Sequence, residues 1–315
     1  MPNSRTHNKL AAVVLLSGGR GMASFAEYTG RATLDLPIDG SNTLGTHWRQ
    51  EVTALATHLA LDHIDLLVVG GARLVSFGQD APGIHHLCRV LQLPDSGEHR
   101  GTGGILRDLA ARFADDQYLL VSTGSTLLLD TLVSLHERLS NAGAAVAFFA
   151  KDDEPANLML VRCGSLRDLP AVGFVDFKEQ AIPKIKSNGS VSAILSDSAP
   201  ALTMRNPMQY LEGLRRIHSG SVSGSATIKL PPVPAAFAES WMPVFSIIEP
   251  GAEVEEGATI HDSVVLRGSR VGRGAIVARS VVPPAAVIGQ DTVVSGKVLH
   301  AKGSGLKSDA RWERS

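Results

Sequence analysis

The residues from position 248 onward repeat with a period that few folds accommodate. Apolar residues fall six apart along this stretch, and glycines occupy turn-like positions between them. Such a period predicts a hexapeptide β-helix, in which short parallel strands stack into coils. An ordinary antiparallel sheet is the alternative. The apolar positions are Ile248, Val254, Ile260, Val265, Val271 and Val277, with a one-residue slip after Ile260, and the glycines are Gly251, Gly257, Gly268, Gly272 and Gly274.

The repeat has room for about three coils. Ser263-Val264 recurs as Ser280-Val281 seventeen residues later. Exposed flat β-faces pair readily, so we expect these coils to serve oligomerisation or docking. Acyl transfer between coils is a further alternative, because a histidine can deprotonate an acceptor there, and His261 and His300 lie in or beside the repeat.

The preceding part of the chain has a different pattern. Short apolar runs alternate with segments of helical spacing, which predicts βαβ units. The expected fold is α/β, with a Rossmann-like, mostly parallel sheet and helices on both faces, followed by the short β-helix. The runs are 11–16, 64–69, 118–122 and 144–149, and the helical segments are 46–61, 104–113, 127–141 and 208–217, the last preceded by Pro207.

Length and local composition set the expected boundaries. A chain of 315 residues exceeds what one core usually supports. Gly/Ser-rich residues 219–225 and proline-rich residues 230–234 indicate a linker. We expect a flexible N-terminus (1–9), an α/β domain (10–225), a linker (226–243), a β-helix domain (244–300) and a disordered tail (301–315).

Charge and composition exclude several partners. A net charge of -1 with 19% charged residues disfavours nucleic acid. The chain lacks an apolar stretch of the ~18 residues that a membrane helix needs. Cys88 and Cys163 are isolated, so neither a disulfide framework nor a zinc site is expected, and a cytoplasmic location fits best. The first apolar run lacks the length and cleavage site of a signal peptide, although export is the alternative.

A glycine-rich turn follows the first apolar run. Gly18-Gly19-Arg20-Gly21 lets backbone N–H groups approach a phosphate, because no Cβ stands in the way. The turn matches neither Gly-x-Gly-x-x-Gly nor a P-loop, which disfavours simple dinucleotide binding and ATPase function. A purely structural tight turn is the alternative interpretation.

Motifs in order along most of the chain resemble the sugar-nucleotide pyrophosphorylases, or sugar-1-phosphate nucleotidyltransferases. That family opens with Gly-Gly-x-Gly-Thr-Arg-Leu, Pro-Lys-Pro and Leu-Pro-Val with a glycine, and it carries Gly-Thr-Ala-Gly at the start of a later helix. The matching stretches here are Gly18 to Gly21, Leu36-Pro37-Ile38 with Gly40, Gly101-Thr102-Gly103-Gly104 with Arg107, Val172 to Glu179 with Pro183, and Pro207 with Tyr210 and Leu211.

The resemblance implies roles for some of these residues. It implies nucleotide binding by the two glycine clusters and a sugar-side role for the segment around Val175. The expected nucleotide-binding residues are Gly18, Gly19, Gly21, Gly101, Thr102, Gly103 and Gly104, and the sugar-side candidates are Gly173 and Asp176.

The family's charged residues are missing. Its reaction is attack of a sugar-1-phosphate on the α-phosphorus of a nucleoside triphosphate, which releases pyrophosphate and depends on cations that neutralise phosphate charge. Relatives use a loop arginine, a lysine and two aspartates that hold Mg²⁺; here these positions carry Ala23, Thr33, Ser125 and Thr203. Neutral hydroxyls are poor substitutes for ionised ligands, so we expect no metal site, and Mg²⁺ only if the chain is active.

Arg20 and Arg31 are the candidate replacements for the lost cations, although Arg20 occupies a variable position of the motif, where a surface side chain is the alternative. Asp35, Asp39 and Asp130 are nearby carboxylates, and Asp130 also fits the start of a helix. Adjacent His85 and His86 point to different faces of any regular element, which disfavours joint metal ligation.

These observations lead to three hypotheses. The first is a regulatory or non-catalytic homologue, weak or inactive in nucleotidyl transfer, which binds a nucleotide or nucleotide-sugar and assembles with itself or with an active relative through its β-helix. The second is an active sugar-1-phosphate nucleotidyltransferase with substitute charged residues. The third is a structural partner that assembles through its β-helix.

Overall fold

The structure is a computed structural model that describes residues 9–18, 26, 29–70, 75, 77, 87–94, 100–151, 154–196, 199–220, 244–297 and 299. The chain divides by contacts into two compact units, one made of Met1–Gly19 and Gly45–Thr203, the other of Arg20–Leu44 and Met204–Ser315. The expectations for residues 1–8, the linker 226–243 and the tail 301–315 lie outside the described residues.

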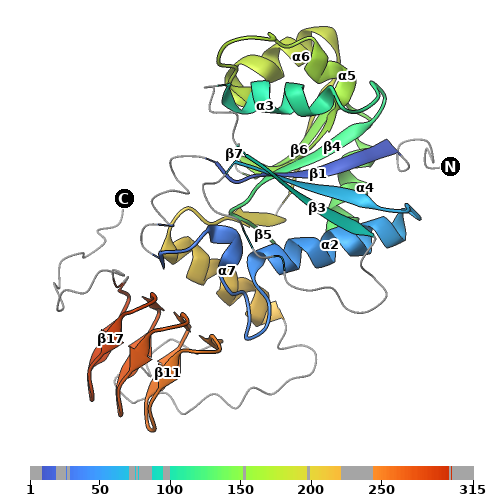
Figure 1. Ribbon diagram of the computed structural model, residues 1–315. Coiled ribbons are helices and arrows are strands. Elements are labelled where there is room, and N and C mark those ends of the chain that lie inside the picture. The colour runs from blue at the N-terminus through green and yellow to red at the C-terminus, as the bar shows by residue number, and fades with distance from the viewer. Residues whose placement is uncertain are drawn as a thin grey trace. The chain divides into compact units, whose positions relative to one another are not determined.

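The first unit contains a seven-stranded, mostly parallel sheet (Figure 1) with the order β3-β2-β1-β4-β7-β6-β8. Only β7 runs antiparallel to its neighbours. The predicted α/β fold is therefore confirmed. The strands are β1 (Leu10–Leu16), β2 (Ile64–Val69), β3 (Cys88–Leu93), β4 (Tyr118–Thr123), β6 (Val146–Lys151), β7 (Glu154–Arg162) and β8 (Val191–Leu195).

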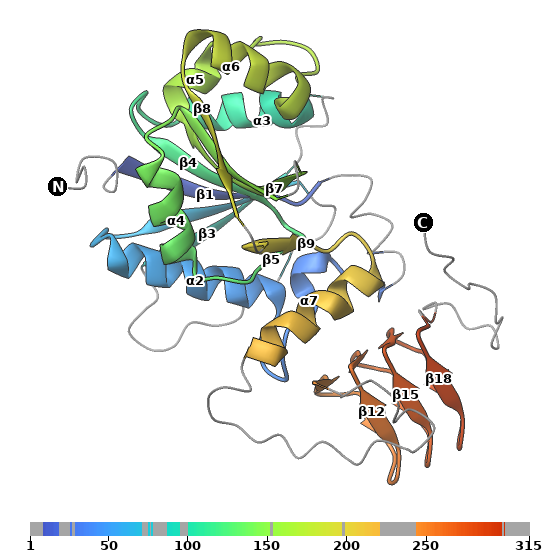
Figure 2. The same ribbon diagram turned by 180° about the vertical axis from the view of Figure 1, so that it is seen from behind.

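Helices cover both faces of this sheet, as Figures 1 and 2 show. Alternate β1 residues Ala12, Val14 and Leu16 pack in one core with Leu106 and Leu166 of the covering helices. The intervening β1 residues are also buried, which explains the continuous apolar run in the sequence. One face carries α2 (Leu44–His58) and α4 (Leu132–Asn141), and the other carries α3 (Gly101–Ala110), α5 (Cys163–Arg167) and α6 (Ile182–Asn188).

One predicted helix is wrong at its start. Residues at the beginning of the expected segment 127–141 form β5 (Thr126–Leu128), which pairs antiparallel with β9 (Ala201–Thr203). The helix itself begins later, at Leu132, because the Thr131 side chain caps it by accepting a hydrogen bond from the Ser134 backbone N–H at 3.3 Å.

The main sheet also contains β3, β7 and β8, which the apolar runs did not predict.

The β-helix of the second unit has three coils built from three parallel sheets. Each strand of the first two coils pairs with the strand seventeen residues further on, as in Ser246 with Ser263, Glu253 with Arg270 and Thr259 with Ile276. The predicted hexapeptide β-helix is confirmed, and the antiparallel alternative is wrong. The strands are β10 (Ser246–Ile248), β11 (Glu253–Val254), β12 (Thr259–His261), β13 (Ser263–Val265), β14 (Arg270–Val271), β15 (Ile276–Ala278), β16 (Val281–Val282), β17 (Val287–Ile288) and β18 (Val293–Ser295).

The coil length follows from its corners. Two sides repeat after six residues and the third after five, as the slip from Ile260 to Val265 indicates. Each corner has a residue with positive φ, a conformation that favours glycine. These residues are Gly251, Gly268 and Ala285 at the first corner, Gly257, Gly274 and Asp291 at the second, and Asp262, Arg279 and Gly296 at the third.

Most of the predicted apolar positions form the core of the coils. Ile260, Val265, Val271 and Val277 are buried together. Ile248 differs, because β10 lies at the edge of its sheet and leaves the Ile248 side chain 41% exposed.

Buried serines connect successive coils. The Ser263 hydroxyl donates to the His261 carbonyl at 2.7 Å and accepts from the Ser280 backbone N–H at 3.0 Å. One coil later, the Ser280 hydroxyl accepts from the Lys297 backbone N–H at 3.2 Å. We call this the serine ladder. It explains why Ser263-Val264 recurs as Ser280-Val281.

The second unit also includes residues 20–44 and α7 (Pro207–Gly220). The Tyr210 hydroxyl donates to the Pro37 carbonyl, and His218 Nε2 lies 2.8 Å from the Ile38 carbonyl oxygen. The His218 ring stacks on Phe245, with the ring centroids 5.6 Å apart. We expected residues 10–225 to form one domain, whereas contacts group these two segments with the β-helix.

Three further properties bear on the expectations from composition. Cys88 and Cys163 are both buried free thiols. Burial raises the pKa of Cys163 to about 11. Among the described helices, none is long and apolar enough to cross a membrane.

Candidate functional site

The strand order of the first unit reverses between β1 and β4. From β1 the chain continues to β2 and β3 on one side, while β4 lies on the other side. Open parallel sheets bind ligands beyond the carboxyl ends of their strands at such a point. Gly18 follows β1, and Gly124, which follows β4, donates its N–H to the Leu16 carbonyl at 2.9 Å. The predicted glycine turn and Ser125 therefore share this edge of the sheet.

Gly18 lies in a tight passage beside the end of β2. A Cβ on Gly70 would come within 2.8 Å of the Gly18 backbone nitrogen, and Gly70 itself has a φ of +81°. The backbones of Gly18 and Gly70 thus lie in direct contact. A side chain at position 70 would clash with Gly18, which explains why glycine occupies this position. The other predicted residues of this turn, Gly19, Arg20 and Gly21, lie outside the described residues, as do Met22 and Ala23.

The second glycine cluster forms the start of α3, where the chain contacts Val175. Gly101 has a φ of +65°, and a Cβ there would lie 2.4 Å from the Val175 carbonyl oxygen. The Gly103 N–H donates to the same oxygen at 2.9 Å, and the Thr102 hydroxyl accepts from the Phe177 N–H at 3.2 Å. Close packing explains Gly101 and Gly103 structurally. Nucleotide contact by residues 101–104 stays a prediction.

The predicted sugar-side residues flank this contact. Asp176 caps the short helix η3 (Phe177–Ala181), accepting from the Lys178 and Glu179 backbone N–H groups at 2.8 and 2.9 Å. Gly173 has a φ of +91° with open space around the position of a Cβ. Its neighbours Val172 and Phe174 are 83% and 62% exposed. The loop 172–174 therefore presents apolar side chains to solvent.

The two positions that the resemblance assigns to metal ligands come close together. Thr126, next to Ser125, pairs with Thr203 in the β5–β9 ladder. Thr123 Oγ1 lies 3.2 Å from Ser125 Oγ and 2.9 Å from Thr126 Oγ1. Asn157 Nδ2 donates to Thr203 Oγ1 at 2.8 Å. We call Thr123, Ser125, Thr126, Asn157 and Thr203 the hydroxyl cluster.

The hydroxyl cluster does not fit Mg²⁺. Its side chains are all neutral, Ser125 and Thr126 are buried, and Thr203 Oγ1 already accepts from Asn157. Mg²⁺ at phosphates is held by one or two carboxylates with near-ideal octahedral geometry. Within the described part of the chain, there is also no group of three His, Cys, Asp or Glu side chains that could hold a metal ion.

Sequence reasoning named Ser125 and Thr203 of the hydroxyl cluster but missed Thr123, Thr126 and, on a different strand, Asn157. This residue lies on β7, the antiparallel strand between β4 and β6. Its contact with Thr203 joins residues 46 apart in the sequence. No local motif marks such a contact, and only the placement of β7 beside β4 could have indicated it.

The candidate cation Arg31 belongs to the second unit and is already paired. Its Nη1 lies 2.6 Å from both carboxylate oxygens of Glu249. Thr33, which stands at the family's lysine position, is buried in the short helix η2 (Thr33–Asp35). Sequence reasoning missed Glu249, because 218 residues separate it from Arg31.

The other candidates make local contacts. Asp130 lies just before α4 and accepts hydrogen bonds from the Thr131 N–H and the Ser134 hydroxyl at 2.8 and 3.0 Å. Asp39 accepts from the Ser41 and Asn42 N–H groups, both at 2.7 Å, and holds a turn. His261 is fully buried. His85, His86 and His300 lie outside the described residues.

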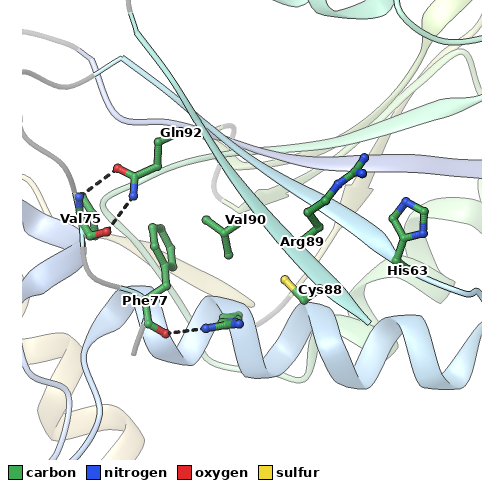
Figure 3. Close-up of a pocket in the computed structure, with 8 residues that line it drawn as sticks. His63, Val75, Phe77, Cys88, Arg89, Val90 and Gln92 are labelled. Atoms are coloured by element: carbon green, nitrogen blue, oxygen red, sulfur yellow. Dashed lines mark hydrogen bonds between the residues drawn. The ribbon is translucent and has the colours of Figure 1, made fainter. Parts of the chain in front are cut away.

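A pocket of about 590 Å³ lies along β3, with apolar and cationic lining (Figure 3). Gln92, Arg89 and Arg49, which line the pocket, all bind other groups of the same protein. The Gln92 amide accepts from the Val75 N–H at 2.9 Å and donates to the Val75 carbonyl at 2.8 Å. Arg89 pairs with Asp65 at 2.7 Å, and Arg49 donates to the Phe77 carbonyl at 3.3 Å. These partners direct the polar groups toward protein atoms, so the switch point remains the candidate site.

The β-helix matches a known family. Residues 244–304 match the model of the GlmU-like, C-terminal hexapeptide family.

Two solved structures are among those to which this chain is similar. One is the crystal structure of HddC from Yersinia pseudotuberculosis, with a TM-score of 0.45 and 14% identity over 65% of this chain and 98% of that chain. The other is the homolog of Mycobacterium tuberculosis rv0371c from Mycobacterium sp. strain JC1, with a TM-score of 0.42 and 16% identity over 66% of this chain and 96% of that chain.

Proposed function

We propose that this chain is a non-catalytic relative of the sugar-nucleotide pyrophosphorylases that binds a nucleotide or nucleotide-sugar in the cytoplasm. The observation that carries the proposal is the hydroxyl cluster. At the switch point of a parallel sheet, the two expected metal-ligand positions are Ser125 and Thr203, joined to neutral hydrogen-bonding partners. Such a site can orient polar ligand groups but brings no carboxylate to a metal ion.

The magnitude of the loss favours binding over transfer. Removing one preorganised group that stabilises transition-state charge typically costs about 2.7 to 4 kcal/mol, or 10² to 10³ in rate. The Arg31 guanidinium, a candidate replacement, is engaged by Glu249. Binding through glycine backbone N–H groups is less affected, because it needs no side chain.

A metal titration tests this proposal. Full-length protein should bind a nucleoside triphosphate or nucleotide-sugar in calorimetry with an affinity that changes less than about twofold when EDTA is replaced by Mg²⁺. Incubation with a nucleoside triphosphate, sugar-1-phosphates and Mg²⁺ together should release no pyrophosphate. Release of pyrophosphate at rates typical of enzymes, on the order of 1 to 10³ s⁻¹, would contradict the proposal.

One variant probes the cluster directly. Thr203→Asp adds a carboxylate to the half-buried position beside Ser125. Mg²⁺ should then raise the melting temperature of the variant, since an ion that binds the folded state stabilises it. The control is Ser187→Asp at an exposed position, for which Mg²⁺ should leave the melting temperature unchanged.

Assembly through the β-helix is the second part of the proposal. Val287 on β17 and Val293 on β18 are 72% and 54% exposed, and both lie on sheets of parallel strands. Exposed apolar side chains on such faces support docking to a second copy or to an active relative.

A further inference from the structure

The last strand of the main sheet, β8, has an open edge (Figure 2). It pairs with β6 on one side, and none of the other described strands pairs with it on the other side. Two of its five residues, Ala193 and Leu195, are exposed, and the Leu195 side chain is exposed to 77%. The outer edge of β8 therefore reaches solvent.

This edge lacks the protection that exposed strands usually have. Natural proteins place charged side chains, proline, a bulge or a covering segment at such an edge, because its free backbone groups can pair with another chain. The opposite edge strand, β3, carries the charged Arg89, and its Gln92 amide holds the backbone of Val75 against the strand. In contrast, β8 reads Val-Ser-Ala-Ile-Leu, and its five pairs with β6 run without a register shift.

The backbone groups of β8 alternate in direction. The Ser190 carbonyl accepts from the Val146 N–H of β6 at 3.2 Å, and the Ser196 N–H donates to a carbonyl of β6 at 3.1 Å. The even-numbered residues thus face β6, and the odd-numbered residues direct both N–H and C=O away from the sheet. These outward residues are Val191, Ala193 and Leu195.

The outward pattern is self-complementary about Ala193. In an antiparallel pair of two β8 strands with Ala193 opposite Ala193, the two alanines exchange both N–H···O bonds, and Val191 of each strand does the same with Leu195 of the other. Every outward group is then used, and Val191 covers the exposed Leu195 side chain on the same face. An axis at Ser192 or Ile194 leaves an end residue unpaired. The strand carries no charge, so the pairing opposes no like charges.

We propose that the edge of β8 is a docking surface for a second copy of this chain, joined by antiparallel β8–β8 pairing about a two-fold axis at Ala193. The contact lies within the first unit and depends neither on nucleotide binding nor on the β-helix. One pair of five-residue strands buries less than the roughly 1,600 Å² of a standard interface, so the dimer should be weak, with a dissociation constant on the order of 10 to 100 μM.

Disulfide trapping in full-length protein tests the register. Ala193→Cys places two thiols opposite each other at the axis, where a Cα separation of about 5.5 Å fits a disulfide. Leu195→Cys is the matched control, because two copies of position 195 would lie about 13 Å apart along the strands. With oxidised glutathione as the oxidant, the Ala193→Cys dimer should form about tenfold faster. The native thiols Cys88 and Cys163 are buried, and the unaltered chain serves as the blank.

A charge exchange at the same position tests the two-fold axis. In sedimentation equilibrium, Ala193→Lys and Ala193→Glu should each raise the dissociation constant about fivefold, because like charges then lie directly opposite each other. An equimolar mixture of the two should associate at least as tightly as the unaltered chain. Ala111→Lys, at an exposed position after α3, is the control and should change the constant less than about twofold. Circular dichroism establishes that each variant is folded.

Two outcomes overturn the proposal: equal rates of crosslinking at positions 193 and 195, or a mixture of the Lys and Glu variants that associates no more tightly than either variant alone. Assembly through the β-helix is a separate result, because it survives Ala193→Lys and gives no preferred crosslink at position 193. Failure of the proposed nucleotide binding leaves both measurements unchanged.

Discussion

At the scale of single residues, the glycines at the start of α3 show how one atom can decide a local structure. Gly101 has a left-handed backbone conformation. A Cβ at this position would also lie only 2.4 Å from the Val175 carbonyl oxygen. Both features fix the contact between α3 and the segment around Val175. The glycine pattern was evident in the sequence. Its packing partner was not, because the segment around Val175 lies some seventy residues further along the chain.

A pair of alanine substitutions separates these two features. Gly101→Ala should lower the free energy of unfolding by about 2 to 4 kcal/mol, since left-handed strain of about 1 to 2 kcal/mol adds to a steric clash of similar size. Gly143→Ala is the control, because Gly143 has a φ of +60° with open space around it, and it should cost about 1 kcal/mol. Urea denaturation measures both. Equal losses would mean that the Val175 contact adds nothing.

At the scale of elements, those marked by a short sequence pattern were easier to predict than the pairing of strands distant in the sequence. The six-residue period predicted the β-helix, and its single slip corresponds to the five-residue side at the corner containing Asp262. The apolar runs predicted β1, β2, β4 and β6 because strands buried on both faces are continuously apolar. β7 and β9 were missed, so the contact between Asn157 and Thr203 was missed as well. Pairing between distant strands depends on topology, which no local pattern records.

The corner of the coil also predicts a pH effect. His261 is fully buried, and burial lowers its pKa, with Asp262 opposing this shift. The unfolded chain therefore binds this proton more readily than the folded chain. Stability from neutral His261 should be present above about pH 6.5 and be lost as the pH falls toward the lowered pKa, at no more than about 1.4 kcal/mol per pH unit.

Unfolding free energies measured from pH 7.5 to 5.5 should therefore fall less steeply in His261→Gln than in the unaltered chain. Val277→Ala, a buried apolar change in the same coils, should lower stability yet keep the original slope. A slope that is identical with and without His261 would assign the effect to other groups.

At the scale of the whole molecule, the divisions by contact and by sequence do not coincide. Residues 20–44 precede most of the α/β sheet in the sequence but group with α7 and the β-helix. The Tyr210 contact with Pro37, the His218 contact with Ile38 and the Arg31–Glu249 pair all lie within this unit. A motif that reads as one loop is thus divided, with Gly18 in one unit and Arg31 in the other.

Hydrogen exchange can detect this division. Val277→Ala creates a small cavity in the β-helix core and should cost about 1 to 3 kcal/mol. Amide exchange should then accelerate in residues 29–44 and 207–220 but not in α3, because segments of one cooperative unit open together. Val121→Ala in β4 is the reciprocal control and should accelerate exchange in α3 instead. Uniform acceleration in both variants would show a single cooperative unit.

The serine ladder also limits how far this molecule can grow. Each rung needs a hydroxyl that receives the amide of the next layer, and Ser263 and Ser280 provide it. The equivalent place in the following layer is held by Lys297, whose side chain can only donate. A further coil stacked there would leave one buried backbone N–H without a hydrogen-bond acceptor. Elongation by duplicating a coil would therefore require replacement of Lys297, so a single side chain acts as the terminator of the stack.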